Sequence, residues 1–531
     1  MIAEDIRKLI DEALKSLDLK VGDFVVEHPA DLKMGDYSTN VGIKYKDKRD
    51  ELVRYIAQNK PSEVEKVELA GPGFINFYLS KEFFKESLEE IIEKEDEFGK
   101  NENLEGEKVI IEHTQPNPFK DFHIGHLMNN VVGEAVAGIF RANGAEVKTA
   151  SYHGDVGLHV AKAIWGRMRN PKLLWGKAYA YGAENYERHK DEIIEINKKI
   201  YNKSDSTLNA LYEKGRKESL ESFEPIYKRL SSNFDYHFYE REAGEVGKEL
   251  VEKNIGKVFE KSEGAIIFKG ENFEPKTHTR VFLNSEGLPT YEAKEVGLAK
   301  IKREKWQYDR SITITANEQD SFFCVVEVAI GKIFPELMGK LKHLSHGILK
   351  LPSGKMSSRT GTVITAEALI EEVKKKVKGD EAVAIGAIKY MILRQAIGND
   401  IVFDIEKSVS TEGDSGVYLQ YAYARTNSLL AKAKSQTRSV WEGGRSMGTR
   451  EIERLLYRFP EIVERAGREY APHYITTYLT ELAGSFNNFY AHEQIIDDSP
   501  ESSYRLAITK AFNIVMKNGL TILGIPAPER M

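Results

Sequence analysis

The stretch "KVIIEHTQPNPFKDFHIGHLMNNVVGEAVAGIFRANG", residues 108–144, predicts the core of an α/β fold. Its apolar start, residues 108–112, is typical of a buried strand, and a polar loop follows. Beyond the loop, apolar residues recur at helical spacing, and Asn143-Gly144 supplies a helix stop. "EVKTASYHGDVG", residues 146–157, then predicts a second strand and loop. This strand–helix–strand order indicates a Rossmann-type, doubly wound parallel sheet, whose ligands bind beyond the carboxyl ends of the strands.

The sequence divides into three regions around this stretch. Residues 1–104 predict a small α+β domain, in which "VELAGPGFINFYL" is typical of a turn followed by a strand. Residues 105–380 predict the α/β domain, with a charged, mostly helical insertion at about 170–265 and strand-like segments at "GAIIF", "TRVFL" and "SITITA". Residues 381–531 are nearly all helical in pattern. We therefore expect a multidomain α/β protein with a small N-terminal α+β domain and an all-α C-terminal domain.

The composition is that of a globular protein without disulfides. The 531 residues carry a formal charge of −6, so a nucleic-acid partner would need a local positive surface. Cys324 is the single cysteine, which excludes intrachain disulfides, CxxC redox chemistry and cysteine-cluster zinc sites. The charged, helically patterned N-terminus is not a signal peptide, and no apolar run is long enough to span a membrane. We expect a soluble, cytoplasmic protein with no membrane partner.

The histidine-rich loop "HIGH", residues 123–126, lies where the first strand passes into the first helix. A helix N-terminus offers free backbone N–H groups and a positive dipole end, which favour an anion. Gly125 would let a phosphate or an adenine ring approach the backbone closely. A helix-capping loop with incidental histidines is an equally simple alternative. Metal binding is less favoured, because the spacing is not HExxH and no third ligand is evident.

A second polar stretch, "LPSGKMSSRTGTV", covers residues 351–363. Two glycines bracket a lysine and several hydroxyls, a composition that suits phosphate contact. It is not a Walker A loop, because the glycine spacing is wrong and Met356 stands where that motif needs Ser or Thr. By itself the stretch would be an ordinary solvated basic loop.

Together, "HIGH" and "KMSSR", residues 355–359, resemble the signature pair of class I aminoacyl-tRNA synthetases. The resemblance implies that His123, His126 and Lys355 are catalytic. They would stabilise charge on the α-phosphorus of ATP while an amino-acid carboxylate attacks it. The implied ATP contacts are Thr114, His123, Gly125, His126, Met356 and Ser357.

Further segments resemble one family within this class, the arginyl-tRNA synthetases. They are "EHTQPNPFKDFHIGH", "SYHGDVG", "PTYEAKEVGLAK", "NEQD", "GDSGVYLQYAYAR" and "LGIPAPERM". "GDYSTN" and "GPGFINF" resemble the family's N-terminal additional domain, which contacts tRNA. The resemblance implies an arginine–tRNA ligase that makes arginyl-adenylate and pyrophosphate from L-arginine and ATP, then transfers the arginyl group to the 3′ end of tRNA(Arg). It also implies Mg²⁺ with the ATP, no zinc or organic cofactor, activation that requires bound tRNA, and a monomer.

The amino-acid site follows from the same resemblance, position by position. The implied arginine contacts are Glu112, Gln115, Asn117, His126, Glu240, Tyr291, Glu295 and Gln319. A guanidinium is a planar cation with five donors, so its pocket needs carboxylates and a flat wall. Glu240 and Glu295 would supply the charge and Tyr291 the wall, although Glu240 matches through a short pattern and could be an ordinary surface residue. The family commonly has Arg-Asp where this chain has Lys294-Glu295, so we expect a different pocket depth.

The signature loop also departs from the family pattern, because Ser358 stands where KMSKS has its second lysine. In arginyl-tRNA synthetases that lack this lysine, one just upstream of "HIGH" is thought to replace it. Lys120 matches that position, and we therefore expect it to be catalytic, the alternative being a solvated loop charge. Arg359 could also reach a phosphate, but its planar fork differs from the point charge of lysine.

The helical C-terminal region resembles the family's anticodon-binding domain. The implied tRNA contacts in "VYLQYAYAR" are Tyr418, Gln420, Tyr421, Tyr423 and Arg425. Aromatic side chains beside cations suit splayed, single-stranded bases. Tyrosines at helical spacing are also common in cores, so we expect some of them to pack inside.

Two other functions remain open from the sequence. Another class I aminoacyl-tRNA synthetase would share "HIGH" and "KMSSR" but should lack two acids converging on the amino-acid side chain. A non-catalytic tRNA-binding homologue would tolerate loss of His123, His126 or Lys355, and all three are present.

Overall fold

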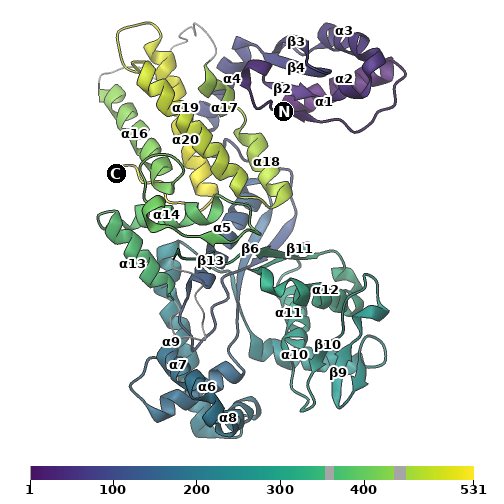
Figure 1. The fold of residues 1–531 in the computed structure, drawn as a ribbon, viewed down its shortest axis with the longest axis vertical. Helices are drawn as coiled ribbons and strands as arrows, with labels where there is room; N and C mark the ends of the chain where they lie inside the picture. Colours follow the sequence, from purple (N-terminus) through teal and green to yellow (C-terminus); the bar gives the residue numbers. More distant parts are fainter. Residues whose placement is uncertain (1, 353–363, 436–449) are drawn as a thin grey trace.

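The computed structural model describes residues 2–352, 364–435 and 450–531. Figure 1 shows the N-terminal domain beside the helical C-terminal domain at one end and the α/β domain below them. The N-terminal domain pairs an antiparallel sheet of order β1-β2-β4-β3 with three helices. Its elements are α1 (Ile2–Ser16), β1 (Val26–Glu27), β2 (Tyr37–Thr39), α2 (Val41–Lys44), α3 (Arg49–Asn59), β3 (Val64–Ala70) and β4 (Phe74–Leu79).

The central sheet has five parallel strands in the order β12-β11-β5-β6-β7. The strands are β5 (Lys108–Glu112), β6 (Glu146–His153), β7 (Tyr236–Tyr239), β11 (Arg310–Ala316) and β12 (Leu341–His346). The chain reverses its direction of travel between β5 and β11, which are neighbours, so their carboxyl ends border the crevice where such sheets bind ligands. This confirms the predicted doubly wound parallel sheet.

Helix α5 (Ile124–Ala142) joins the sheet to the C-terminal domain, and most of its residues are buried. One face covers the sheet, and the other packs against α14 (Glu381–Leu393), α18 (Phe459–Glu469) and α20 (Ser502–Ile522). Gly138 allows the closest approach, because a Cβ there would lie 2.0 Å from the backbone oxygen of Ile522. The two domains therefore share one hydrophobic core.

The region predicted as a helical insertion at about 170–265 forms two separate excursions from the sheet. The first is helical, with α6 (Leu158–Arg169), α7 (Trp175–Glu184), α8 (Lys190–Asn202) and α9 (Ser206–Leu230). The chain then returns as β7, which the sequence pattern did not reveal because the strand is short and lies at the edge of the sheet. The second excursion contains α10 (Glu240–Lys253), β8 (Glu260–Ser262), β9 (Ala265–Phe268), β10 (Arg280–Leu283) and α11 (Tyr291–Lys305). "GAIIF" and "TRVFL" are thus strands, but of a separate antiparallel sheet.

The rest of the chain is mainly helical. It comprises α4 (Lys81–Lys94), α12 (Asp320–Ile333), β13 (Leu349–Lys350), α13 (Ala366–Lys376), β14 (Ile401–Val402), α15 (Ile405–Ser408), α16 (Gly416–Ser435), α17 (Glu451–Leu456) and α19 (His473–His492), in addition to α14, α18 and α20. Tyr457, between α17 and α18, is buried in the core of the N-terminal domain, so the two ends of the chain pack together. Among the described helices, none is long and apolar enough to cross a membrane.

Candidate active site

A cavity of about 680 Å³ lies beyond the carboxyl ends of β5 and β11. Residues from the β5–α5 loop, α5, α10, α11 and the segment after β11 line it. Ten predicted site residues are among them: Glu112, Thr114, Gln115, Asn117, Lys120, His126, Glu240, Tyr291, Glu295 and Gln319. His123 is not in the lining but stacks on His126 with ring centroids 3.6 Å apart. The fold therefore gathers these residues at the crevice where a doubly wound sheet binds its ligands.

The β5–α5 loop has an unusual backbone. Thr114, Gln115 and Phe119 have positive φ angles of 73°, 49° and 70°, which side-chain-bearing residues seldom adopt. Side chains from other elements hold the loop: His153 Nδ1 donates to the Pro116 carbonyl at 2.8 Å, and the Ser219 hydroxyl accepts from the Phe119 N–H at 3.0 Å. Such a backbone persists where its surroundings fix it, as at binding sites.

The two histidines of "HIGH" cap α5 with their own side chains. His123 Nδ1 accepts from the Gly125 N–H at 3.1 Å, and His126 Nδ1 accepts from the His123 N–H at 3.2 Å. With both Nδ1 atoms accepting, each neutral ring carries its proton on Nε2. Burial lowers the pKa of His123 to about 4 and that of His126 well below its usual range, so both rings are neutral at pH 7.

This capping corrects the expectation of free backbone N–H groups at the start of α5. The Gly125 N–H is bonded to His123, and the Ile124 N–H donates to the Ile364 carbonyl at 3.2 Å. A Cβ at Gly125 would lie 2.9 Å from His123 Cε1, so the glycine makes room for the histidine ring. An anion here would meet the Nε2–H groups and the helix dipole instead.

The chain that follows the second signature segment, residues 364–366, is bonded to the first signature segment and the residue before it. The Ala366 N–H donates to the Phe122 carbonyl at 2.9 Å, alongside the bond from Ile124 to Ile364. Residues just after the "KMSSR" stretch therefore pair with residues just before and within "HIGH". The predicted residues Lys355, Met356, Ser357, Ser358 and Arg359 lie outside the described residues.

Lys120 projects into the same cavity as His126. Its Nζ lies 4.9 Å from the centre of the Tyr179 ring. Burial lowers the pKa of Lys120, while the charge of Glu240 acts in the opposite direction. The ammonium group is thus a partly desolvated cation that faces the space beside the histidines.

Glu112 and Glu240, two of the predicted acids in the cavity, already have lysine partners. Glu112 is buried, forms an ion pair with Lys302 and accepts from Gln115 Nε2 at 2.6 Å. Glu240 is buried and pairs with Lys294 at 2.6 Å. Each carboxylate is therefore largely neutralised by a lysine of α11.

Glu295 differs from these acids. It is half-buried, it lines the cavity, and within the described residues no hydrogen bond or ion pair reaches its carboxylate. Burial raises the pKa of Glu295, and the negative charge of Glu112 adds to the effect. Tyr291, one helical turn earlier, is 61% exposed and lies at the cavity margin, where its ring faces Lys294 Nζ at 4.9 Å. The arrangement presents one uncompensated carboxylate beside an aromatic face.

Some residues that shape the site were not predicted. Lys302 neutralises Glu112, and His153 holds the β5–α5 loop. Arg280 lines the cavity and pairs with Glu292 at 2.9 Å. His153 lies within "SYHGDVG", which resembled the family, whereas Lys302 and Arg280 had no signal beyond their charge.

In the C-terminal domain the structure separates the five predicted tRNA contacts. Tyr421 is 42% exposed, and the Arg425 guanidinium lies 4.7 Å from its ring and 5.2 Å from that of Tyr490, which is also exposed. Tyr418 is half-buried, and its hydroxyl accepts from Asn487 at 2.7 Å.

The predicted role of Gln420 and Tyr423 as tRNA contacts does not fit the structure, because both side chains are buried. Gln420 Nε2 donates to the carbonyls of Ala382 and Pro526 at 3.1 and 2.7 Å, so its amide is used inside the domain. The Gln420 amide has no free donor for an anticodon base, and the Tyr423 ring is nearly covered, although its edge borders a cavity of about 650 Å³. They face the opposite side of α16 from Tyr421, as expected for an amphipathic helix.

Models of three domain families match the chain in order. The "Arginyl tRNA synthetase N terminal domain" matches residues 4–79, the "tRNA synthetases class I (R), catalytic domain" residues 87–405, and the "DALR anticodon binding domain" residues 419–531. The chain is 32% identical to an arginine–tRNA ligase of Streptococcus mutans, over 96% of each chain. It is 30% identical to one of Streptococcus pneumoniae, over 100% of this chain and 99% of the relative.

A solved structure has the same fold over its full length. The arginyl-tRNA synthetase of Thermus thermophilus superposes with a TM-score of 0.82 at 23% identity, with all of both chains covered.

Proposed function

Because the chain belongs to the arginyl-tRNA synthetases, we propose that it activates L-arginine with ATP and transfers the arginyl group to the 3′ end of tRNA(Arg). The relatives it matches are named arginine–tRNA ligases and are aligned along nearly their whole length. The reaction needs a site for a guanidinium, a site for the α-phosphate of ATP and a surface for tRNA.

The observation that carries the proposal is the unpaired carboxylate of Glu295. In a cavity where lysines neutralise Glu112 and Glu240 and Arg280 neutralises Glu292, Glu295 lines the wall without an ion pair among the described residues and is available to bind a cation. A guanidinium would form charge-assisted hydrogen bonds with it and lie against Tyr291. An apolar or acidic side chain would leave the carboxylate buried and uncompensated, which opposes its binding.

Adenylate formation requires donors around the α-phosphorus. The arginine carboxylate oxygen attacks this atom, and the bond to pyrophosphate breaks, with charge spread over the equatorial oxygens. The Nε2–H groups of His123 and His126 are positioned as neutral donors by their capping bonds, and Lys120 supplies a cation from the same side. Lys355 would act with them, but it lies outside the described residues.

Mg²⁺ would enter with ATP. Among the described residues, no group of three or more His, Cys, Asp or Glu side chains is arranged to hold a metal ion. A metal bound mainly through substrate phosphates needs no such group, since Mg²⁺ keeps several waters and takes few protein ligands.

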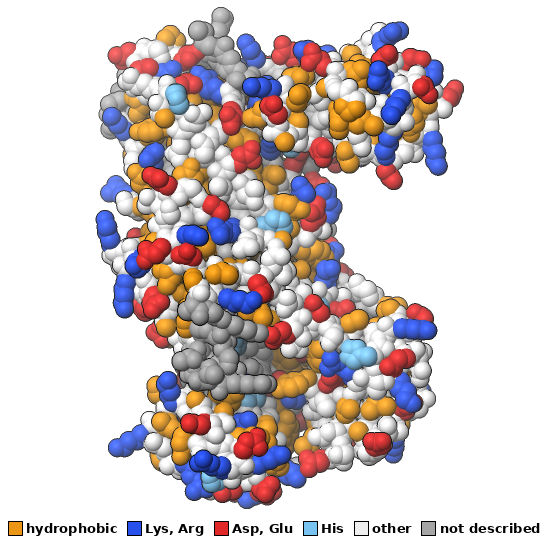
Figure 2. Space-filling view, viewed as in Figure 1, with side chains coloured by type: hydrophobic (Ala, Val, Ile, Leu, Met, Phe, Trp, Pro, Cys, Tyr) orange, Lys and Arg blue, Asp and Glu red, His pale blue; other side chains and the backbone are white. Residues whose placement is uncertain are grey.

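We further propose that anticodon bases stack on Tyr421 and Tyr490, with Arg425 between the two rings. The view in Figure 2 shows a hollow between the N-terminal domain and the second excursion of the α/β domain. Acidic and basic side chains are interspersed on this face, so tRNA binding would rely on local contacts. We also propose a cytoplasmic location, because the single cysteine suits a reducing compartment, and a monomer, as expected from the sequence.

ATP–pyrophosphate exchange with each amino acid, with and without tRNA, tests the proposed function. We expect exchange with arginine alone among the amino acids, dependent on tRNA. Exchange driven by glutamate or glutamine would contradict the arginine assignment. No exchange under any condition would favour a tRNA-binding protein without catalysis.

A further inference from the structure

We propose that Asp155 is a positioning residue for the arginine pocket and that it acts through Glu240. The proposal rests on the proposed function, because it concerns the same pocket. Asp155 belongs to the segment "HGD", residues 153–155, at the carboxyl end of β6. It does not line the substrate cavity.

The Asp155 carboxylate is completely buried and receives donors from two elements. Arg216 Nε, on α9, donates to Oδ2 at 2.7 Å, and the Tyr212 hydroxyl donates to the same atom at 3.4 Å. The backbone N–H of Arg241, in the first turn of α10, donates to Oδ1 at 3.0 Å. The carboxylate thus joins the first excursion of the chain to the second.

The bond to Arg241 supplies a helix cap that α10 otherwise lacks. The residue before the helix, Tyr239, makes no side-chain capping bond. Asp155 fills that role from a distant segment, with its negative charge at the positive end of the helix dipole. Because Glu240 is the first residue of α10, the cap fixes the backbone from which the Glu240 carboxylate reaches the cavity.

The neighbouring glycine shows how little freedom Glu240 has. A Cβ at Gly154 would lie 2.3 Å from Asn117 Oδ1 and 3.1 Å from Glu240 Oε1. The "HGD" segment thus packs closely against two predicted arginine ligands, Asn117 and Glu240, and also holds the start of α10. A shift of α10 by a fraction of an ångström would change the distance between Glu240 and a bound substrate.

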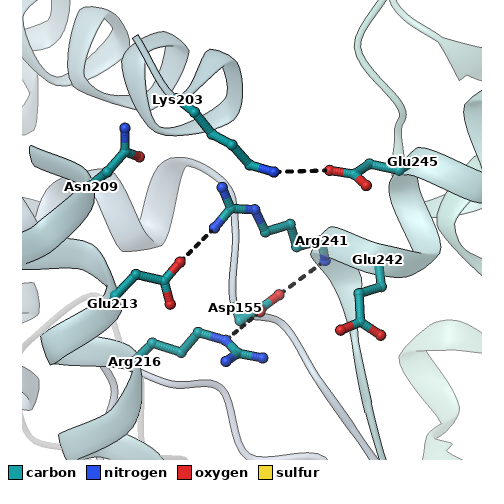
Figure 3. Close-up of a pocket in the computed structure, with 8 residues that line it drawn as sticks. All are labelled: Asp155, Lys203, Asn209, Glu213, Arg216, Arg241, Glu242 and Glu245. Atoms are coloured by element: carbon teal, nitrogen blue, oxygen red, sulfur yellow. Dashed lines mark hydrogen bonds and ion pairs between the residues drawn. The ribbon is translucent and has the colours of Figure 1, made fainter. Parts of the chain in front are cut away.

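The other side of Asp155 faces a second cavity, of about 390 Å³, between α9 and α10. Figure 3 shows Arg216 and Arg241 crossing it, with Arg241 Nη1 donating to Glu213 at 3.0 Å. Asp155 and this ion pair therefore tie α10 to α9 at two points. Glu242, on the same helical turn as Glu240, borders the cavity but is exposed.

The test uses Asp155→Asn in the full-length enzyme. An amide has a single oxygen, so either the Arg216 Nε–H or the Arg241 N–H must face an NH₂ group. We expect the arginine KM to rise roughly tenfold, as for loss of one buried charge-assisted bond, with the ATP KM and kcat changed much less. The matched control is Glu242→Gln, which removes a charge from the same turn and should leave every constant near the wild-type value.

A double-mutant cycle with Glu240→Gln separates positioning from general damage. If Asp155 acts through Glu240, Asp155→Asn should add little to the arginine KM of Glu240→Gln. Equal effects in both backgrounds, or an unchanged arginine KM in the single variant, would overturn the proposal.

If Asp155→Asn does not fold, as judged by circular dichroism, Arg216→Met replaces it in the cycle with the same expectations. Loss of arginine-dependent exchange in the wild type would instead refute the proposed function, so the two failures are distinguishable.

Discussion

Replacing Glu295 by Gln removes a cavity carboxylate that has no hydrogen-bond or ion-pair partner within the described residues, while keeping the shape of the side chain. A hydrogen bond to a charged group contributes about 1.5–3 kcal/mol, so we expect the arginine KM to rise roughly 10- to 100-fold. The ATP KM should change little, because Glu295 is not among the implied ATP contacts. Steady-state pyrophosphate exchange with tRNA present measures both constants. The control is Glu304→Gln, which removes an exposed charge from the end of the same helix.

The same substitution should affect the stability of the ligand-free protein in the opposite sense. Since the folded-state pKa of Glu295 is raised, ionisation of its carboxyl disfavours folding above that pKa, and the penalty disappears below the ordinary value of 4.5. Glu295→Gln should therefore unfold at a higher temperature than wild type at mildly alkaline pH, with a difference that vanishes in acid. Arginine should raise the Tm of wild type but not of the variant. A variant that is less stable without arginine, or equally protected by it, would refute the reasoning.

Three further predictions concern the rest of the site. Lys120→Ala should slow adenylate formation by orders of magnitude in single-turnover assays with little change in tRNA affinity, and near-normal activation would make the lysine an ordinary loop charge. Because the pKa of His123 is about 4, kcat/KM for ATP should show no inflection near pH 6.5, and a descending acid limb there that His123→Asn abolishes would contradict a neutral ring. Tyr421→Ala and Tyr490→Ala should each weaken tRNA binding roughly 5- to 100-fold in filter-binding assays, as for loss of one stacked base, and unchanged affinity would exclude the proposed stacking surface.

Much of the catalytic site could be predicted because its residues belong to local motifs at strand ends. Most of the predicted residues in the lining belong to the loop after β5 and the start of α11, and a doubly wound sheet brings ligand-binding segments together at the carboxyl ends of its strands. "HIGH" and residues 364–366 are distant in sequence, but they lie at the starts of α5 and α13. The hydrogen bond from the Ile124 N–H to the Ile364 carbonyl brings the starts of these two helices together.

Whether each glutamate of the cavity is paired with a cation could not be predicted, because the pairing depends on residues far along the chain. Glu240 is neutralised by a lysine 54 residues away, and nothing in the local pattern specifies that pairing. From the sequence, Glu240 and Glu295 would both supply charge to the pocket, with Glu240 the less secure of the two, whereas the structure pairs Glu240 with Lys294 and leaves Glu295 unpaired among the described residues. Desolvation and ion pairing, both tertiary effects, distinguish the two.

Helix α16 shows a second reason why the sequence could not identify every site residue. Tyr421 and Tyr423 stand two positions apart, and their composition alone favours base stacking for both. Only the packing of α16 decides that Tyr421 faces outward while Tyr423 and Gln420 face the core. Likewise, the free N–H groups expected at the start of α5 are used by the histidine side chains, because two imidazoles can cap a helix as well as bind an anion.

The most direct test of this account is a crystal structure with L-arginine and a non-hydrolysable ATP analogue. The account predicts the guanidinium on the Glu295 carboxylate, with Tyr291 beside it, and the α-phosphate within hydrogen-bonding distance of Lys120 and the Nε2 atoms of the "HIGH" histidines. A guanidinium bound away from Glu295, or an α-phosphate beyond the reach of Lys120, would contradict it.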